Sequence, residues 1–189
     1  AVFPDDDGAL DILPFIWAPK ERVPAIAKML GPFGTAFQQW VTDGLIQTTD
    51  GNQVDYRAVE NKIAWLASEF DLVEIDYDKW NAADMIQRVM DTGVRCVEVA
   101  QGVGLSAAIK ELQKRVLART IRHSNHPVLA WMASCSKAKP DPNENLRLVK
   151  AVRNEEAARV DGIAALITAL SRAMVDQGAT SAPFAVEMW

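Results

Sequence analysis

Apolar residues recur at helical spacing along three long stretches of the chain. From Asp55 to Phe70 they stand at steps of three and four residues, which predicts one face of an amphipathic helix. The stretches Leu105 to Arg119, whose stripe includes Val116 and Leu117, and Val160 to Met174 show the same pattern. Shorter helices are expected at Pro19 to Leu30, Phe37 to Leu45, Ala82 to Thr92 before the cap residue Gly93, and Pro127 to Ser134.

Short apolar runs between these helices predict strands. The chain opens with the tail of one strand, a turn at Asp5 to Gly8, and a second strand through Ile12 to Trp17, which together predict a hairpin. The polar, proline-containing run Lys137 to Asn145 is expected to be a loop. Later strands are expected at Leu72 to Tyr77, Val94 to Val99, and Leu146 to Val152. Because strands and helices alternate after the hairpin, the order predicts an α/β layered domain with a mixed sheet.

The predicted strand Leu72 to Tyr77 ends in acidic residues. Side chains alternate along a strand, so Glu74, Asp76 and Asp78 are expected on one face if the strand stays regular. Ligand sites in open α/β sheets lie beyond the carboxyl ends of strands, which is where Asp78 falls. The alternative is that Asp78 only caps the following helix or faces solvent, and the local sequence on its own favours this alternative.

A second acid, Asp161, stands at the start of the apolar helix predicted from Val160 to Met174. Capping is again the alternative interpretation. A helix that is apolar over much of its surface is expected to pack on the sheet, so its first turn could lie over the strand ends. Two acids that meet there could share a divalent cation, because Mg²⁺ takes oxygen ligands and usually one or two carboxylates.

Composition narrows the classes of function. A chain of 189 residues that is 49% hydrophobic and 24% charged is expected to form one soluble domain. Cys96 and Cys135 lack metal-ligand spacing and are interpreted as reduced thiols of a cytosolic protein. No apolar run approaches the roughly 18 residues of a membrane helix, and the net charge of −5 argues against a polycation that coats nucleic acid. His123 and His126 have no acidic or cysteine partner at zinc-ligand spacing, and no phosphate loop or serine elbow is present.

Four blocks follow one another along the chain: WVTDGLIQTTDGNQVDY, YDKWNAADM, QGVGLSAAIKELQKRVLARTIRHSNHPVLAWMAS and VDGIAALITALSRAM. In this order and at these separations they resemble the C-terminal nuclease domain of the large terminase subunit of tailed bacteriophages and prophages. The resemblance covers most of the chain. It implies an RNase H-like mixed sheet flanked by helices, with residues 1–189 as a single nuclease domain without the packaging ATPase domain.

The resemblance also implies site residues. The family's Tyr-Asp-x-Trp-Asn block carries a metal-binding aspartate, here Asp78, and the Asp-Gly that opens the late helix carries another, here Asp161. Asp76 is outside that pattern and is expected at most as an outer-shell or substitute ligand. A further family aspartate lies on the first strand, ahead of Ala1, so the chain is expected to lack that strand and one ligand and to be inactive or impaired. The basic residues before the last Asp-Gly also differ, since Glu155 and Glu156 stand there.

The implied activity is cutting of concatemeric double-stranded DNA with two Mg²⁺ or Mn²⁺ ions, in the bacterial host cytoplasm and without a membrane. Expected partners of the parent protein are its ATPase domain, the small terminase subunit and the portal. A phosphate-facing surface could come from Lys110, Lys114, Arg115, Arg119 and Arg122, for which a solvated helix face is an equal alternative. A non-catalytic module that docks on the portal or motor, or clamps DNA, is the alternative function. A RuvC-like resolvase fits the quoted blocks less well.

Overall fold

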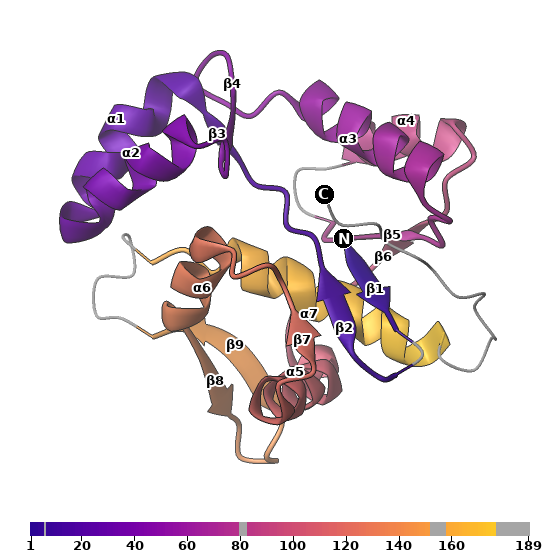
Figure 1. Ribbon diagram of the computed structural model, residues 1–189. Coiled ribbons are helices and arrows are strands. Elements are labelled where there is room, and N and C mark those ends of the chain that lie inside the picture. Colours follow the sequence, from indigo (N-terminus) through magenta and orange to yellow (C-terminus); the bar gives the residue numbers. More distant parts are fainter. Residues whose placement is uncertain (6, 80–82, 152–157, 177–189) are drawn as a thin grey trace. The chain divides into compact units, whose positions relative to one another are not determined.

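The structure is a computed structural model that describes residues 1–5, 7–79, 83–151 and 158–176 (Figure 1). Its residues group into two compact units. Unit 1 comprises Ala1–Pro14, Gly102–Val149 and Val160–Trp189, and unit 2 comprises Phe15–Gln101 and Lys150–Arg159. Strands pair both in parallel and antiparallel fashion and are accompanied by helices, so the predicted mixed α/β class is confirmed.

Unit 1 contains a three-stranded sheet of β1 (Val2–Pro4), β2 (Leu10–Ile12) and β7 (Ile121–Arg122). β1 runs antiparallel to β2, as predicted, and β2 runs parallel to β7. The second strand was expected to continue to Trp17, but β2 ends at Ile12 and Trp17 lies in unit 2. Pro14 explains the break, because proline has no amide hydrogen for a sheet ladder.

The helices of unit 1 are α5 (Ser106–Ala118), α6 (Pro127–Ser134) and α7 (Asp161–Asp176), with the short 3₁₀ helix η3 (Val103–Leu105) before α5. α7 packs against α5, α6 and β1. Buried side chains of β2, α5, α6 and α7 form the core, and the largest fully buried ones in unit 1 are Leu10, Val128, Ile167 and Leu170. The apolar stripe of α7 therefore faces the core, as its period predicted.

Val116 and Leu117 share an apolar cleft with Ile109 and Leu112 of the same stripe, and they are 58% and 85% exposed because this cleft is open. One expectation for unit 1 was wrong. The stretch predicted as a loop contains a strand, β8 (Ser136–Pro140), which pairs with β9 (Leu146–Lys150). Its Lys, Ala and Pro residues are weak strand formers, so pairing with β9 and not intrinsic propensity selects the extended form.

Unit 2 contains two pairs of parallel strands and the remaining helices. β3 (Trp17–Pro19) pairs with β4 (Gln47–Thr49), and β5 (Ile75–Tyr77) pairs with β6 (Cys96–Glu98). The helices are η1 (Lys20–Arg22), α1 (Val23–Met29), η2 (Gly31–Phe33), α2 (Gly34–Thr42), α3 (Tyr56–Glu69) and α4 (Ala83–Asp91). α1 packs closely on α2, since a Cβ at Gly34 would lie 2.2 Å from the carbonyl oxygen of Ala27.

An aromatic cluster covers one side of α3. The Trp65 ring meets Phe15 and Phe70 edge to face, at centroid distances of 6.2 and 5.9 Å. Lys62 Nζ lies 4.3 Å from the centre of the Trp65 ring, within cation–π distance. These contacts anchor α3 in unit 2. In the described part of the chain, no helix is both long and apolar enough to cross a membrane.

Candidate functional site

Asp78 lies directly after the carboxyl end of β5, the position expected from the sequence. β5 and β6 run parallel, with Tyr77 opposite Glu98. The ladder continues to the end of the strand, because the Val99 N–H donates to the Tyr77 carbonyl oxygen at 2.9 Å. Asp78 itself is half-buried. Its backbone is therefore held by the sheet at the edge where ligands of open α/β folds bind.

Two other acids flank the β5–β6 pair, Glu74 just before β5 and Glu98 at the end of β6, and each has a cationic partner. Glu74, whose side chain is only 5% exposed, forms an ion pair with Arg95 at 3.3 Å. Glu98, at the carboxyl end of β6, forms one with Lys79 at 3.6 Å. Glu98 was not found from the sequence, because only the register of β5 and β6 places it beside Asp78.

Asp76 lies within β5, and its Oδ1 atom is buried. Burial raises the pKa of the nearby Cys96 thiol, and the negative charge of Asp76 raises it further. Cys96 is therefore a protonated thiol at neutral pH and not a thiolate ligand. The expected role of Asp76 as an outer-shell or substitute ligand stays a prediction.

Asp161 is the first residue of α7 and is exposed, while the next turns of the helix bury Ile163 and Ile167. The following residue, Gly162, packs tightly on α6. Its N–H donates to the Met132 sulfur at 3.3 Å, and a Cβ there would lie 2.8 Å from the same atom. This contact leaves no room for a side chain at position 162, which explains why a glycine stands there. It also holds the first turn of α7 against α6, and with it the backbone at Asp161.

Asp78 belongs to unit 2 and Asp161 to unit 1, and the positions of these units relative to one another are not determined. Their meeting over a cation therefore stays a prediction. Among the residues that the structure describes, no three Asp, Glu, His or Cys side chains converge on a metal-sized site. The donor chemistry of the two residues suits Mg²⁺ or Mn²⁺, since both ions prefer carboxylate oxygen.

The two histidines bind backbone amides at the start of α6. His126 is the N-cap residue, and its Nδ1 accepts the Leu129 N–H at 3.4 Å. His123 Nδ1 accepts the His126 N–H at 3.1 Å. Burial lowers the pKa of His126, and the charge of His123 lowers it further. Both acceptor nitrogens must be unprotonated for these hydrogen bonds to form.

Unit 1 is expected to lose stability as the pH falls below 6.5, the ordinary pKa of histidine. The folded-state pKa of His126 is lower, so the unfolded chain binds the proton more readily. The stabilisation that neutral His126 gives as the N-cap of α6 is fully present above pH 6.5 and is lost as the pH falls below it. Loss of an N-cap acceptor costs about 1 kcal/mol of unfolding free energy. Urea unfolding at pH 7.5 and 5.5 measures this effect. In His126→Asn, a good cap that does not titrate, this part of the pH dependence should disappear; an unchanged dependence would contradict the assignment.

Three of the five basic residues expected to face phosphate are engaged within unit 1. Arg115 is buried, and it donates to Glu111 and to the Gly8 carbonyl oxygen, both at 2.8 Å. It fits neither the phosphate surface nor the solvated face, and both expectations for it were wrong. Lys114 pairs with Glu111 at 3.3 Å.

Arg122 joins β7 to the first hairpin. Its Nε and Nη2 donate to the two carboxylate oxygens of Asp11 at 2.7 and 2.6 Å, and Nη2 also donates to Asp5 at 2.5 Å. These hydrogen bonds raise the pKa of Arg122. Of the predicted phosphate-facing set, Lys110 and Arg119 remain as exposed cations on α5 and at its end.

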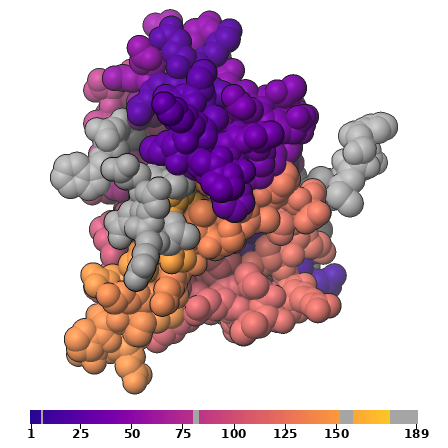
Figure 2. Space-filling view, turned by 90° about the vertical axis from the view of Figure 1, so that its left-hand side faces the viewer, coloured from indigo at the N-terminus to yellow at the C-terminus, as the bar shows by residue number. Residues whose placement is uncertain are grey.

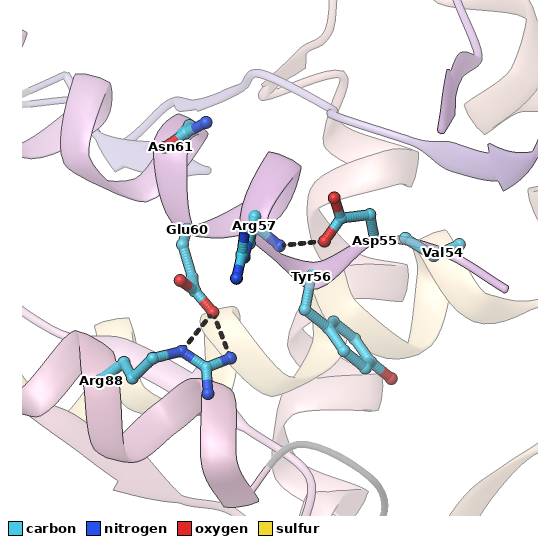
Figure 3. A pocket seen from close by; sticks show the side chains of 7 residues that line it. All are labelled: Val54, Asp55, Tyr56, Arg57, Glu60, Asn61 and Arg88. Carbon is cyan, nitrogen blue, oxygen red and sulfur yellow. Dashed lines mark hydrogen bonds and ion pairs between the residues drawn. The ribbon is translucent and has the colours of Figure 1, made fainter. Parts of the chain in front are cut away.

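Polar side chains line an open pocket of about 560 Å³ in unit 2, where α3 meets α4 (Figure 3). Glu60 and Arg88 point toward one another, and both Nε and Nη2 of Arg88 donate to Glu60 Oε1, at 2.9 and 2.6 Å. Asp55 accepts the Arg57 N–H at 2.9 Å and caps α3. Two acids thus balance two arginines, and the pocket offers no net charge to attract phosphate.

The chain matches known proteins over most of its length. Residues 26–177 match the family described as "Terminase large subunit, endonuclease domain". The terminase large subunit of Enterobacteria phage HK97 is 30% identical over 172 residues, which cover 89% of this chain and 33% of the relative. Protein YmfN of Escherichia coli K12 is 27% identical over 166 residues, which cover 87% of this chain and 36% of the relative.

The fold matches a solved structure as well. The crystal structure of the HK97 bacteriophage large terminase has a TM-score of 0.76 and 29% identity, and the match covers 90% of this chain and 35% of that one. The chain thus spans about a third of the length of the relatives it matches. The mixed α/β architecture is consistent with the expected RNase H-like fold. The family match takes in Asp78 and Asp161 together, and the chain belongs to the endonuclease domain family of the terminase large subunit.

Proposed function

We propose that the two units form one nuclease domain, and that the parent protein uses it to cut concatemeric double-stranded DNA during packaging. The observation that carries the proposal is the position of Asp78 at the carboxyl end of the parallel β5–β6 pair, within a region that matches an endonuclease family. Asp161, at the anchored start of α7, supports it as a second acid at the end of an element.

In this proposal Asp78 and Asp161 hold Mg²⁺ or Mn²⁺ through carboxylate oxygens, with a third acid from the sequence ahead of Ala1. When bound, such ions lower the pKa of water and offset charge on the phosphate during phosphodiester hydrolysis. The protein's own part is to hold the acids in place. The β5–β6 ladder fixes the backbone at Asp78, and the Gly162 contact with Met132 fixes it at Asp161.

The wider setting of the domain is part of the same proposal. The relatives are about three times as long as this chain, so the parent protein has room for a packaging ATPase domain. We propose the small terminase subunit and the portal as its partners and the bacterial host cytoplasm as its location. Sequence preference in cutting should be slight, because contacts to the phosphate backbone carry no base information.

The test is Mn²⁺-dependent nicking of a supercoiled plasmid by a longer chain that includes residues preceding Ala1. Wild type is compared with Asp78→Asn and Asp161→Asn, and loss of nicking in both variants supports the proposal. Equal nicking by all three proteins would remove these residues from the mechanism and favour a docking or clamping module.

A further inference from the structure

An apolar cleft of about 550 Å³ opens on the surface of unit 1, between α5, α6, α7 and the β8–β9 hairpin. Its floor belongs to the core, because Leu112, Leu129 and Ile163 are buried. Its rim does not, because Val116 and Leu117 of α5 are exposed. Apolar surface left in water costs free energy, and a patch of this kind with polar residues around it is typical of an interaction site.

The walls of the cleft leave room for an incoming backbone. Ala130 and Ala133, one turn apart on α6, line the cleft together with Ala138 of β8. Such small side chains let a helix lie close, because the distance between packed helices depends on the side chains at the contact. Figure 2 shows the hairpin as the orange lobe that stands out at the lower left, so this wall projects from the surface. The cleft therefore suits a helix with apolar residues at i, i+3, i+4 and i+7.

The charge at the edge of the cleft is positive. The residues that line it, all in the described part of the chain, include Lys137 and contain no Asp or Glu. Arg119 stands between Leu117 and Ile121, which both line the cleft. Lys137 and Arg119 are exposed, and within the described ranges neither forms an ion pair. A chain with a net charge of −5 thus presents cations around this apolar surface, which favours a partner that carries acids.

We propose that the cleft binds an amphipathic helix of a partner protein. The helix inserts its apolar side chains between α5 and the hairpin, against Val116 and Leu117, and places Asp or Glu near Lys137 and Arg119. A small apolar molecule would fill the floor but leave both cations without a counter-charge. The phosphate backbone of DNA would supply negative charge but no apolar side chains for the floor.

The probe is a fluorescein-labelled helical peptide of about 16 residues, with Leu at i, i+3, i+4 and i+7 and Glu on both flanks of that stripe. Fluorescence anisotropy measures its binding to the 189-residue chain. Leu117→Ala should lower the affinity by about 10-fold, because the leucine side chain becomes buried only in the complex. Urea unfolding of this variant should match wild type, since Leu117 is exposed in the free protein.

The charge is tested by exchange on both sides of the interface. Lys137→Glu should weaken binding of the Glu-flanked peptide by about 2- to 5-fold, and should strengthen binding of the same peptide with Lys in place of Glu. Two matched controls make the same changes elsewhere in unit 1. They are Leu13→Ala, at another exposed leucine, and Lys110→Glu, at another exposed cation, and neither residue lines the cleft. Both controls should bind the Glu-flanked peptide like wild type.

Four results would overturn the proposal. They are no binding at protein concentrations up to about 1 mM, equal or tighter binding of the Lys-flanked peptide by wild type, equal loss in either control, and a wild-type dimer in sedimentation that Leu117→Ala dissociates. The last result would make a second copy of the chain the occupant. None of these measurements uses cleavage, Asp78 or Asp161, so a negative result leaves the nuclease proposal standing.

Discussion

Plasmid nicking by the longer chain is expected to fall by at least about 100-fold in both Asp78→Asn and Asp161→Asn. Asparagine keeps the size of the side chain and removes the negative charge that would attract a divalent cation. Metal ions contribute several kcal/mol of transition-state stabilisation, and each 1.36 kcal/mol corresponds to a factor of ten in rate. The rate of loss of supercoiled plasmid in Mn²⁺ measures the effect, and Mn²⁺ titration of the same proteins gives a readout independent of cleavage.

Two comparisons make this experiment specific. Asp84→Asn removes an exposed acid from the first turn of α4, close in sequence to Asp78, and should nick at the wild-type rate. The double variant of Asp78 and Asp161 should fall little further than either single variant, because residues that act as a unit are not additive. Full multiplication of the two losses would show that the acids act separately, and would contradict a shared cation.

The helices were predictable because their signals are local. The apolar stripe of α3 is visible in the sequence, and the observed helix starts and ends within a residue of the prediction. Gly93 has a φ of +90° where α4 was expected to stop. The same local pattern cannot say whether another element covers a face. Val116 continues the stripe of α5 and is nevertheless exposed, since it borders an open cleft.

Strand pairing was the part that the sequence could not supply. β8 has weak strand formers and becomes a strand because β9 pairs with it. Residues that depend on register were missed for the same reason. Glu98 comes beside the end of β5 only through the β5–β6 pairing. The candidate site was therefore predictable as two acids at element ends, while its electrostatic surroundings were not.

Leu170→Ala is expected to lower the free energy of unfolding by about 3 to 5 kcal/mol, the range for a leucine in a packed core. Leu170 is 1% exposed and lies on α7, which packs on α5, α6 and β1, so the substitution removes buried contacts and leaves a cavity. Urea unfolding measures the change. The matched control is Leu117→Ala, the same substitution at a side chain 85% exposed, which should stay within about 0.5 kcal/mol of wild type. Equal effects at both positions would contradict the burial of α7.

A third variant, Ile46→Ala, turns this measurement into a test of whether the two units form one nuclease domain. Ile46 is 2% exposed and belongs to unit 2, whereas Leu170 belongs to unit 1. If the units unfold as one cooperative domain, a single transition should shift to lower urea in both variants. Two transitions, each shifted by only one of the variants, would show independent units. A site that needs both Asp78 and Asp161 would then depend on docking of the units, and DNA or metal should raise the cooperativity of unfolding.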